Sequence, residues 1–237
     1  MQSLVNRERV VGRMTRTSSL GKALLFALVA YMMFVVVRTD LTYLTPTPEI
    51  AEHYTKVGWW LLPHGIAGAL ALFLGPLQFS NTLRQRKPAW HRAIGRTYVY
   101  GAIAAAPLGV YLEWMKYVRG IGSLRLVFAI VGLASLWLLT TVRAFVLAKK
   151  RRILEHREYM VRSYAVAAIF LETRVVSYTP LLSRWFQPIS DWCDAHSISD
   201  MWVFVLAAPV IAELILHLDL RTSRRAPSVR SATSLEV

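Results

Sequence analysis

Cysteine and acidic residues are scarce in this sequence. Cys193 is the single cysteine among 237 residues, which excludes an internal disulfide and a metal site built from several cysteines. Charged residues make up 18% of the chain, fewer than a soluble domain of this length carries. The G-x-S-x-G, H-E-x-x-H and phosphate-binding glycine-loop motifs are also missing. Their absence removes the hydrolase and nucleotide-binding classes that these motifs mark.

Long apolar blocks dominate what is present. Apolar residues make up 55% of the chain, and its mean hydropathy is positive. Blocks of about 20 residues match a hydrocarbon core of roughly 30 Å, because an α-helix rises about 1.5 Å per residue. The sequence therefore predicts an all-α, polytopic membrane helix bundle. Its six predicted transmembrane helices cover residues 20–37, 58–79, 97–117, 124–147, 160–182 and 201–218.

Polar ends frame the predicted transmembrane domain of residues 20–218. Residues 1–19 form a basic segment, and residues 219–237 form a Ser- and Arg-rich tail that we expect to be disordered. Most of the 28 Lys and Arg residues lie in these ends and in the connections 80–96 and 148–162. By the positive-inside rule, this predicts a multi-pass protein of the cell membrane with both termini in the cytoplasm. Because the basic residues flank apolar blocks, we expect no nucleic-acid partner.

Two stretches of the chain are nearly the same. Residues 91–98 (HRAIGRTY) and residues 156–164 (HREYMVRSY) each contain a His-Arg pair, a second Arg, a small hydroxyl residue and a Tyr. Each follows a basic run and opens a long apolar stretch. The predicted spans two and three, and four and five, would form two hairpins with one such stretch at the start of each returning helix. This pattern predicts a tandem repeat of helical hairpins.

The repeat suggests a shared cofactor site. Haem b in a membrane needs two imidazoles on facing helices at one depth, with cations for its propionates. His91 and His156 are matched in depth by the repeat, so a haem-binding or redox membrane protein is the most specific hypothesis. The cations beside them are Arg92, Arg96, Arg157 and Arg162. A metal site is a further hypothesis, with the ligands His91, His156, His217 and Glu213.

Ionisable residues within the predicted spans support an alternative from another class. Such residues are costly at membrane depth and usually face the bundle interior. His64, Glu172 and Arg174, with Gln78 nearer the cytoplasmic side, could line a site for a small molecule or a lipid headgroup in a non-enzymatic binding or transport module. Border Arg residues are more often topology signals and contacts to anionic lipid headgroups. We therefore expect membrane lipids as partners, while the sequence leaves a homo-oligomer and catalysis open.

The order of motifs resembles one known family. The chain reads PHG at 63–65, GPLQF at 75–79, HRAIGRTY at 91–98, LWLLTT at 136–141, HR at 156–157, Met160, RSY at 162–164, and Arg174. This combination is similar to the membrane-protein family called domain of unknown function 2306, over about residues 60–182. The resemblance implies a multi-span membrane protein and no established reaction. Tyr159 stands where the family typically has Trp, and Glu172 lies outside the pattern.

Overall fold

The computed structural model describes residues 19–40, 47 and 58–225. The described residues form helices and no strand, which confirms the all-α prediction. The α-helices are α2 (Ser19–Asp40), α4 (Leu61–Leu74), α5 (Asn81–Arg86), α6 (Pro88–Val118), α7 (Leu124–Lys149), α8 (Ile153–Tyr178), α9 (Pro180–Ala195) and α10 (Met201–Arg225), and a 3₁₀ helix, η2, covers Pro76–Phe79.

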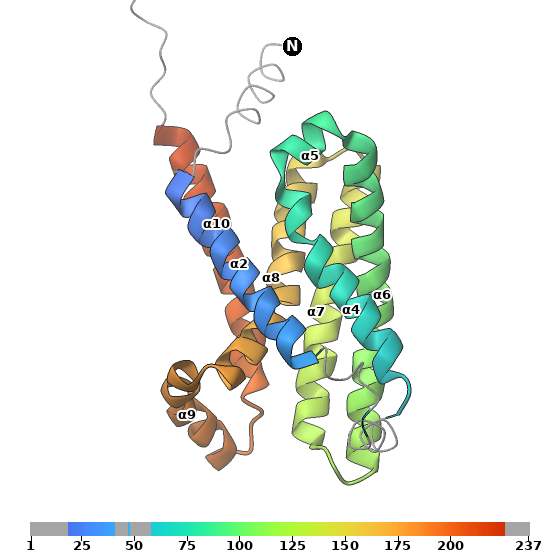
Figure 1. Cartoon of the computed structure of the whole chain (residues 1–237), viewed down its shortest axis with the longest axis vertical. Helices are drawn as coiled ribbons and strands as arrows, with labels where there is room; N and C mark the ends of the chain where they lie inside the picture. Colours follow the sequence, from blue (N-terminus) through green and yellow to red (C-terminus); the bar gives the residue numbers. More distant parts are fainter. Residues whose placement is uncertain (1–18, 41–46, 48–57, 226–237) are drawn as a thin grey trace, which may run out of the picture.

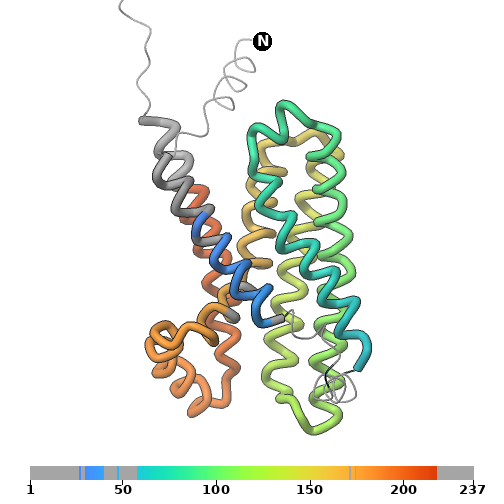
Figure 2. The backbone as a smooth tube through the Cα atoms, viewed as in Figure 1, coloured from blue at the N-terminus to red at the C-terminus, as the bar shows by residue number. Residues whose placement is uncertain are grey.

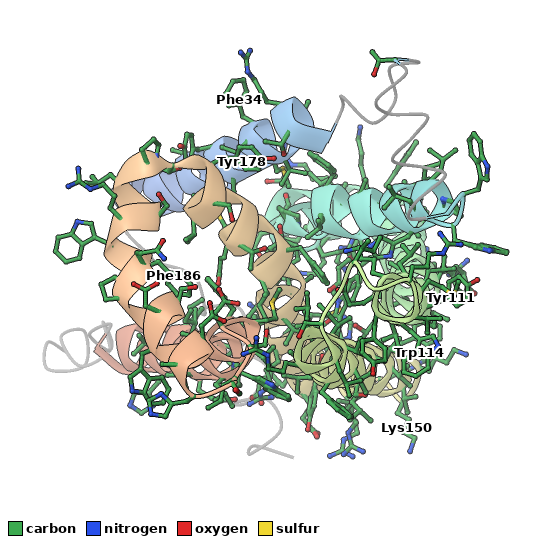
Figure 3. The ribbon with its side chains drawn as sticks, turned by 90° about the horizontal axis from the view of Figure 1, so that it is seen from below. Phe34, Tyr111, Trp114, Lys150, Tyr178 and Phe186 are labelled. Carbon is green, nitrogen blue, oxygen red and sulfur yellow. The ribbon has the colours of Figure 1, made fainter. Side chains whose placement is uncertain are left out.

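A bundle of α4, α6, α7 and α8 forms the centre of the molecule (Figure 1). The backbone runs along α4, turns through η2 and α5, and returns as α6 beside α4 (Figure 2). Helices α7 and α8 form the next antiparallel pair, and both α2 and α10 pack against α8. Although α2 and α10 overlap in Figure 1, the end-on view of Figure 3 separates them. We call the end that holds α5 and the α7–α8 turn the basic end.

Local signals in the sequence explain where the helices begin and turn. The Ser80 side chain accepts a hydrogen bond from Leu83 N at 3.2 Å and caps α5, and Ser123 caps α7 in the same way, from Arg125 N at 3.3 Å. Pro88 occupies the first turn of α6, where a missing N–H leaves no hydrogen bond unmade. Gly120 has φ +72° between α6 and α7, a conformation that favours glycine.

By length and composition, fewer described helices qualify as membrane spans than the six predicted. Among the described residues, two helical stretches, Leu61–Phe79 and Leu124–Lys149, are long and apolar enough to cross a membrane. The pair α8 and α9 would make a third, but it is bent by 104°. Most of each predicted segment is helical, yet the other candidate helices carry more polar side chains or have shorter apolar parts. The structure thus supports a helical membrane protein without confirming six spans.

Two helix ends differ from the ends of the predicted spans. The fifth predicted span reaches residue 182, whereas α8 ends at Tyr178 and Pro180 opens α9. A proline disfavours a helical conformation in the residue before it, so the chain breaks there. Helix α9 is held by Phe186, labelled in Figure 3, whose ring centroid lies 4.9 Å from that of Phe204 in α10. Helix α10 also continues to Arg225, past the predicted end of the sixth span. Residues 1–18 and 226–237 lie outside the described residues.

Small residues allow α4 and α6 to approach closely. Ala71, Ala105 and Gly101 are buried where the two helices meet. A Cβ atom added to Gly101 would lie 2.8 Å from the carbonyl oxygen of Ala67. The Ala67 carbonyl oxygen belongs to the α4 backbone and can move away only if the helix itself moves. This contact therefore requires glycine at position 101.

We predict opposite effects of alanine at two glycines of this hairpin. Gly101→Ala should lower the free energy of unfolding by about 1–3 kcal/mol, since it overpacks the α4–α6 contact. Gly68→Ala should leave it unchanged or raise it by up to about 1 kcal/mol, because a Cβ atom there meets nothing within 4 Å and alanine favours the helix. Unfolding in mixed micelles of mild and denaturing detergent measures both. Equal effects of the two substitutions would contradict this packing.

Candidate functional site at the basic end

A buried hydrogen-bond network joins the two hairpins. The hydroxyl groups of Tyr98 in α6 and Ser163 in α8 lie 2.7 Å apart. Thr141 Oγ1 of α7 lies 2.6 Å from Ser163 Oγ, and Trp137 Nε1 donates to the Tyr98 hydroxyl at 3.2 Å. Tyr98, Thr141 and Ser163 have no exposed surface. Hydroxyls buried at such a depth must bond to each other, so this network allows few relative positions of the helices.

Tyr164 makes a corresponding contact in the opposite direction. Its hydroxyl donates to the carbonyl oxygen of Leu72 in α4 at 3.2 Å. Its ring lies so close to Gly75 that a Cβ atom there would collide with it. Tyr98 and Tyr164 end the two repeated stretches, and each reaches the first helix of the other hairpin. These contacts follow the repeat that the sequence predicts, although a tandem duplication remains a prediction.

The two His-Arg pairs lie at the start of α6 and α8, both at the basic end (Figure 1). His156 Nδ1 bonds to the carbonyl oxygen of Ala144 at 2.8 Å. The carbonyl oxygen of His91 accepts a hydrogen bond from Gln78 Nε2 at 3.3 Å. In contrast, His91 Nδ1 and Arg157 Nη1 are buried without a hydrogen-bond partner in the described part of the chain. Buried polar atoms of this kind are rare and call for an explanation.

Positive charge accumulates around these two atoms. Burial lowers the pKa of His91, and the charges of Arg84, His156 and Arg92 lower it further. Burial also lowers the pKa of Arg84, with a second contribution from the charge of Arg157. These charge effects link Arg84, His91, His156 and Arg157, and we call these four residues the basic cluster.

Neighbouring acidic groups are engaged outside the basic cluster. Glu155 accepts two hydrogen bonds from Arg152, both at 2.6 Å. Arg162, which we expected beside a cofactor, donates to Glu213 of α10 at 2.6 Å and lies 3.5 Å from Glu158. Arg84 itself donates to Asn81 Oδ1 at 2.7 Å, a neutral acceptor. Among the described residues, no carboxylate forms an ion pair with the basic cluster.

The structure does not assemble the predicted metal site. Glu213 pairs with Arg162, and His217 is exposed on α10. Across residues 19–40 and 58–225, no group of three His, Cys, Asp or Glu side chains could hold a metal ion. Arg92 and Arg96, two of the predicted propionate partners, are exposed.

The predicted binding site of His64, Glu172 and Arg174 is described only in part. His64 Nδ1 bonds to the carbonyl oxygen of Ala105 at 2.9 Å, with its ring against Gly109. Glu172 is half-buried in α8, and no hydrogen bond or ion pair joins it to His64 in the described region. Arg174 lies in α8, but its side chain is outside the described residues. The described side chains of His64 and Glu172 thus make no direct contact, and a site shared by these residues stays a prediction.

Sequence reasoning missed two groups of residues. Glu113 is 7% exposed and binds Lys116 Nζ at 2.8 Å, and its spacing of three residues from Lys116 is the available signal. The network around Tyr98 was also missed, although the Thr-Tyr and Ser-Tyr pairs recur in the repeat. Nothing in the sequence places Arg84 beside Arg157, since they lie on α5 and α8.

This arrangement of helices belongs to a part of the chain that matches a known family. The family described as "Predicted membrane protein (DUF2306)" matches residues 61–215. The chain belongs to this family. The DUF2306 match contains both hairpins, the buried network and the basic cluster, and it begins after α2. No curated protein and no solved structure matches the chain. This DUF2306 chain is therefore a membrane protein of an uncharacterised family, as the resemblance predicts.

The histidines of the basic cluster predict a loss of stability in acid. Both lie before the apolar segments that begin at residues 97 and 160, and burial lowers the pKa of each. The unfolded chain then binds protons more readily than the folded chain, so stability falls as pH drops below the ordinary His value of about 6.5.

We expect the thermal unfolding midpoint to fall between about pH 7.5 and about pH 5.5, on either side of that value. The measurement uses neutral detergent without phosphate. The double variant His91→Gln and His156→Gln should flatten the pH dependence. His196→Gln, at an exposed site beyond α9, should leave it intact; an equal slope in all three proteins would refute the assignment.

Proposed function

We propose that this protein is a non-enzymatic membrane module that binds a phosphate-bearing anion at the basic cluster. The observation that carries this proposal is the pair of buried, unpartnered nitrogen atoms, His91 Nδ1 and Arg157 Nη1. An unsatisfied buried donor destabilises a protein by about 1–3 kcal/mol. A phosphate group has several acceptor oxygens, which can accept from the Arg157 guanidinium and from an N–H of the His91 imidazole together.

The position of the basic cluster agrees with a ligand from the membrane surface. Helix α2 begins and α10 ends at the basic end, where α5 also lies (Figure 1). We infer from the basic residues there that this end faces the cytoplasm, as the positive-inside rule expects. The cytoplasmic leaflet is rich in anionic lipids, so a lipid headgroup and a soluble phosphate compound are two sources of the same chemistry.

We predict that Arg84→Gln and Arg157→Gln each weaken binding of inorganic phosphate about ten-fold or more, because each removes a charge-assisted contact. Arg86→Gln is the matched control: it removes the same charge from the same short helix, but Arg86 is exposed. Calorimetric titration of the purified protein with phosphate, at constant ionic strength, measures the affinity.

A second arm separates the two sources. If the natural ligand is a headgroup, nanodiscs of phosphatidylglycerol should compete with phosphate and nanodiscs of phosphatidylcholine should not. If it is soluble, phosphate affinity should be the same in both. No phosphate binding in either bilayer, or an equal loss in Arg86→Gln, would contradict the proposed function.

A haem or redox function is the second candidate, and one observation favours it. His156 Nδ1 bonds to the carbonyl oxygen of Ala144, which leaves Nε2 available, as in many metal-binding histidines. The charge of His156 also lowers the pKa of His91. Arg157 is the predicted propionate partner that remains beside them.

This candidate predicts a visible absorption spectrum. Protein produced with haem supplied and purified in detergent should carry a Soret band, and His156→Ala should abolish it while His196→Ala should keep it. A wild-type protein without that band would eliminate the haem hypothesis and leave the anion site untouched.

A further inference from the structure

The two hairpins are similar in sequence but differ in what covers their outer faces. Helix α10 lies against α8 and α7. Its Trp202 ring approaches Gly132 of α7 so closely that a Cβ atom there would lie 2.7 Å from the ring. Near the basic end, Glu213 of α10 binds Arg162 of α8 at 2.6 Å. Helix α10 thus covers the second hairpin with apolar side chains, and near the basic end its Glu213 carboxylate pairs with Arg162.

No described helix covers the corresponding face of the first hairpin. In the repeat, Arg96 corresponds to Arg162, so Tyr100 of α6 corresponds to Val166 of α8. Tyr100 is 61% exposed, whereas Val166 is 1% exposed. Arg96 is exposed at the basic end of this face. The first hairpin therefore has the Arg of the second, without the carboxylate and without the covering helix in the described part of the chain.

An apolar groove runs along this uncovered face. It has a volume of about 400 Å³ and is open along its side, near the lower end of the roughly 300–1,000 Å³ that small-molecule pockets occupy. Residues of both helices line it, including Ile66, Ala67, Leu70, Tyr100, Gly101 and Ala104. Thr97, next in sequence to Arg96, lines the end of the groove nearest the basic end.

We propose that an anionic phospholipid occupies this face, with one acyl chain in the α4–α6 groove and its phosphate bound by Arg96. The lipid phosphate would bind Arg96 as the Glu213 carboxylate binds Arg162 on the second hairpin. The acyl chain would cover the first hairpin as the apolar side chains of α10 cover the second. The side chain of Trp90, 64% exposed two turns before Thr97, suits the headgroup region of a bilayer.

A lipid fits these observations better than a partner helix. A partner helix would need a carboxylate opposite Arg96, as α10 places Glu213 opposite Arg162, and no described helix supplies one there. An anionic lipid supplies the same charge at the membrane surface without a further helix. This site is separate from the basic cluster, because Arg84, His91, His156 and Arg157 do not line the groove.

The test compares lipid retention in the purified full-length protein by native mass spectrometry. After exchange into mixed micelles with equal amounts of phosphatidylglycerol and phosphatidylcholine of the same chain length, wild type should retain phosphatidylglycerol with a preference of about ten-fold. Arg96→Gln should remove this preference. Arg151→Gln, which removes an exposed Arg from the α7–α8 turn, should keep it.

A groove-filling variant tests the position of the chain. Ala104→Phe should reduce retention of both lipids, whereas Val142→Phe, at an exposed site on α7, should not. The proposal would be overturned if the wild type retained both lipids equally. It would also be overturned if neither Arg96→Gln nor Ala104→Phe changed lipid retention. A wild-type dimer that Ala104→Phe dissociates would overturn it as well, because the occupant would then be a second copy. Phosphate binding at the basic cluster should be unchanged in both variants, which separates failure here from failure of the proposed function.

Discussion

The hydrogen bond between the Tyr98 and Ser163 hydroxyls is the contact on which the rest of the arrangement depends. It joins the second helix of one hairpin to the second helix of the other, with Thr141 and Trp137 completing the network. In an apolar interior these groups have no water to bond with, so a shift of either hairpin would leave several of them unsatisfied. The network therefore sets the relative depth of α6 and α8, and with it the depth at which their His-Arg pairs lie.

Because the hairpins are held at matched depth, the basic residues of α5, α6 and α8 converge although they repel one another. The buried, unpartnered atoms of His91 and Arg157 are the local consequence of that convergence, and an anion would relieve both the repulsion and the missing hydrogen bonds. Arg162 shows the alternative solution in the same molecule, since Glu213 neutralises it. The contrast between a paired Arg in one repeat and an exposed Arg96 in the other is the basis for placing a lipid on the first hairpin.

The sequence was sufficient for features that depend on neighbours along one helix or between consecutive helices. It predicted most of the helical segments and the position of His91 and His156 near the start of α6 and α8. It did not predict contacts between helices that are distant in the sequence. Arg162 was expected beside a cofactor, but it pairs with Glu213 of α10. The metal set failed for the same reason, since His217 lies exposed on α10. Helix α8 ends before residue 182 because Pro180 disfavours a helical conformation in the residue before it.

A double-mutant cycle between Tyr98→Phe and Ser163→Ala tests most directly whether the two hairpins are joined through this network. The free energy of unfolding in mixed micelles would be measured for the wild type, both single variants and the double variant. Groups that bond to each other should show a coupling of at least about 0.5 kcal/mol. The same cycle with Tyr100, exposed on the outer face of α6, in place of Tyr98 should give none. Strictly additive effects of Tyr98→Phe and Ser163→Ala would contradict the account.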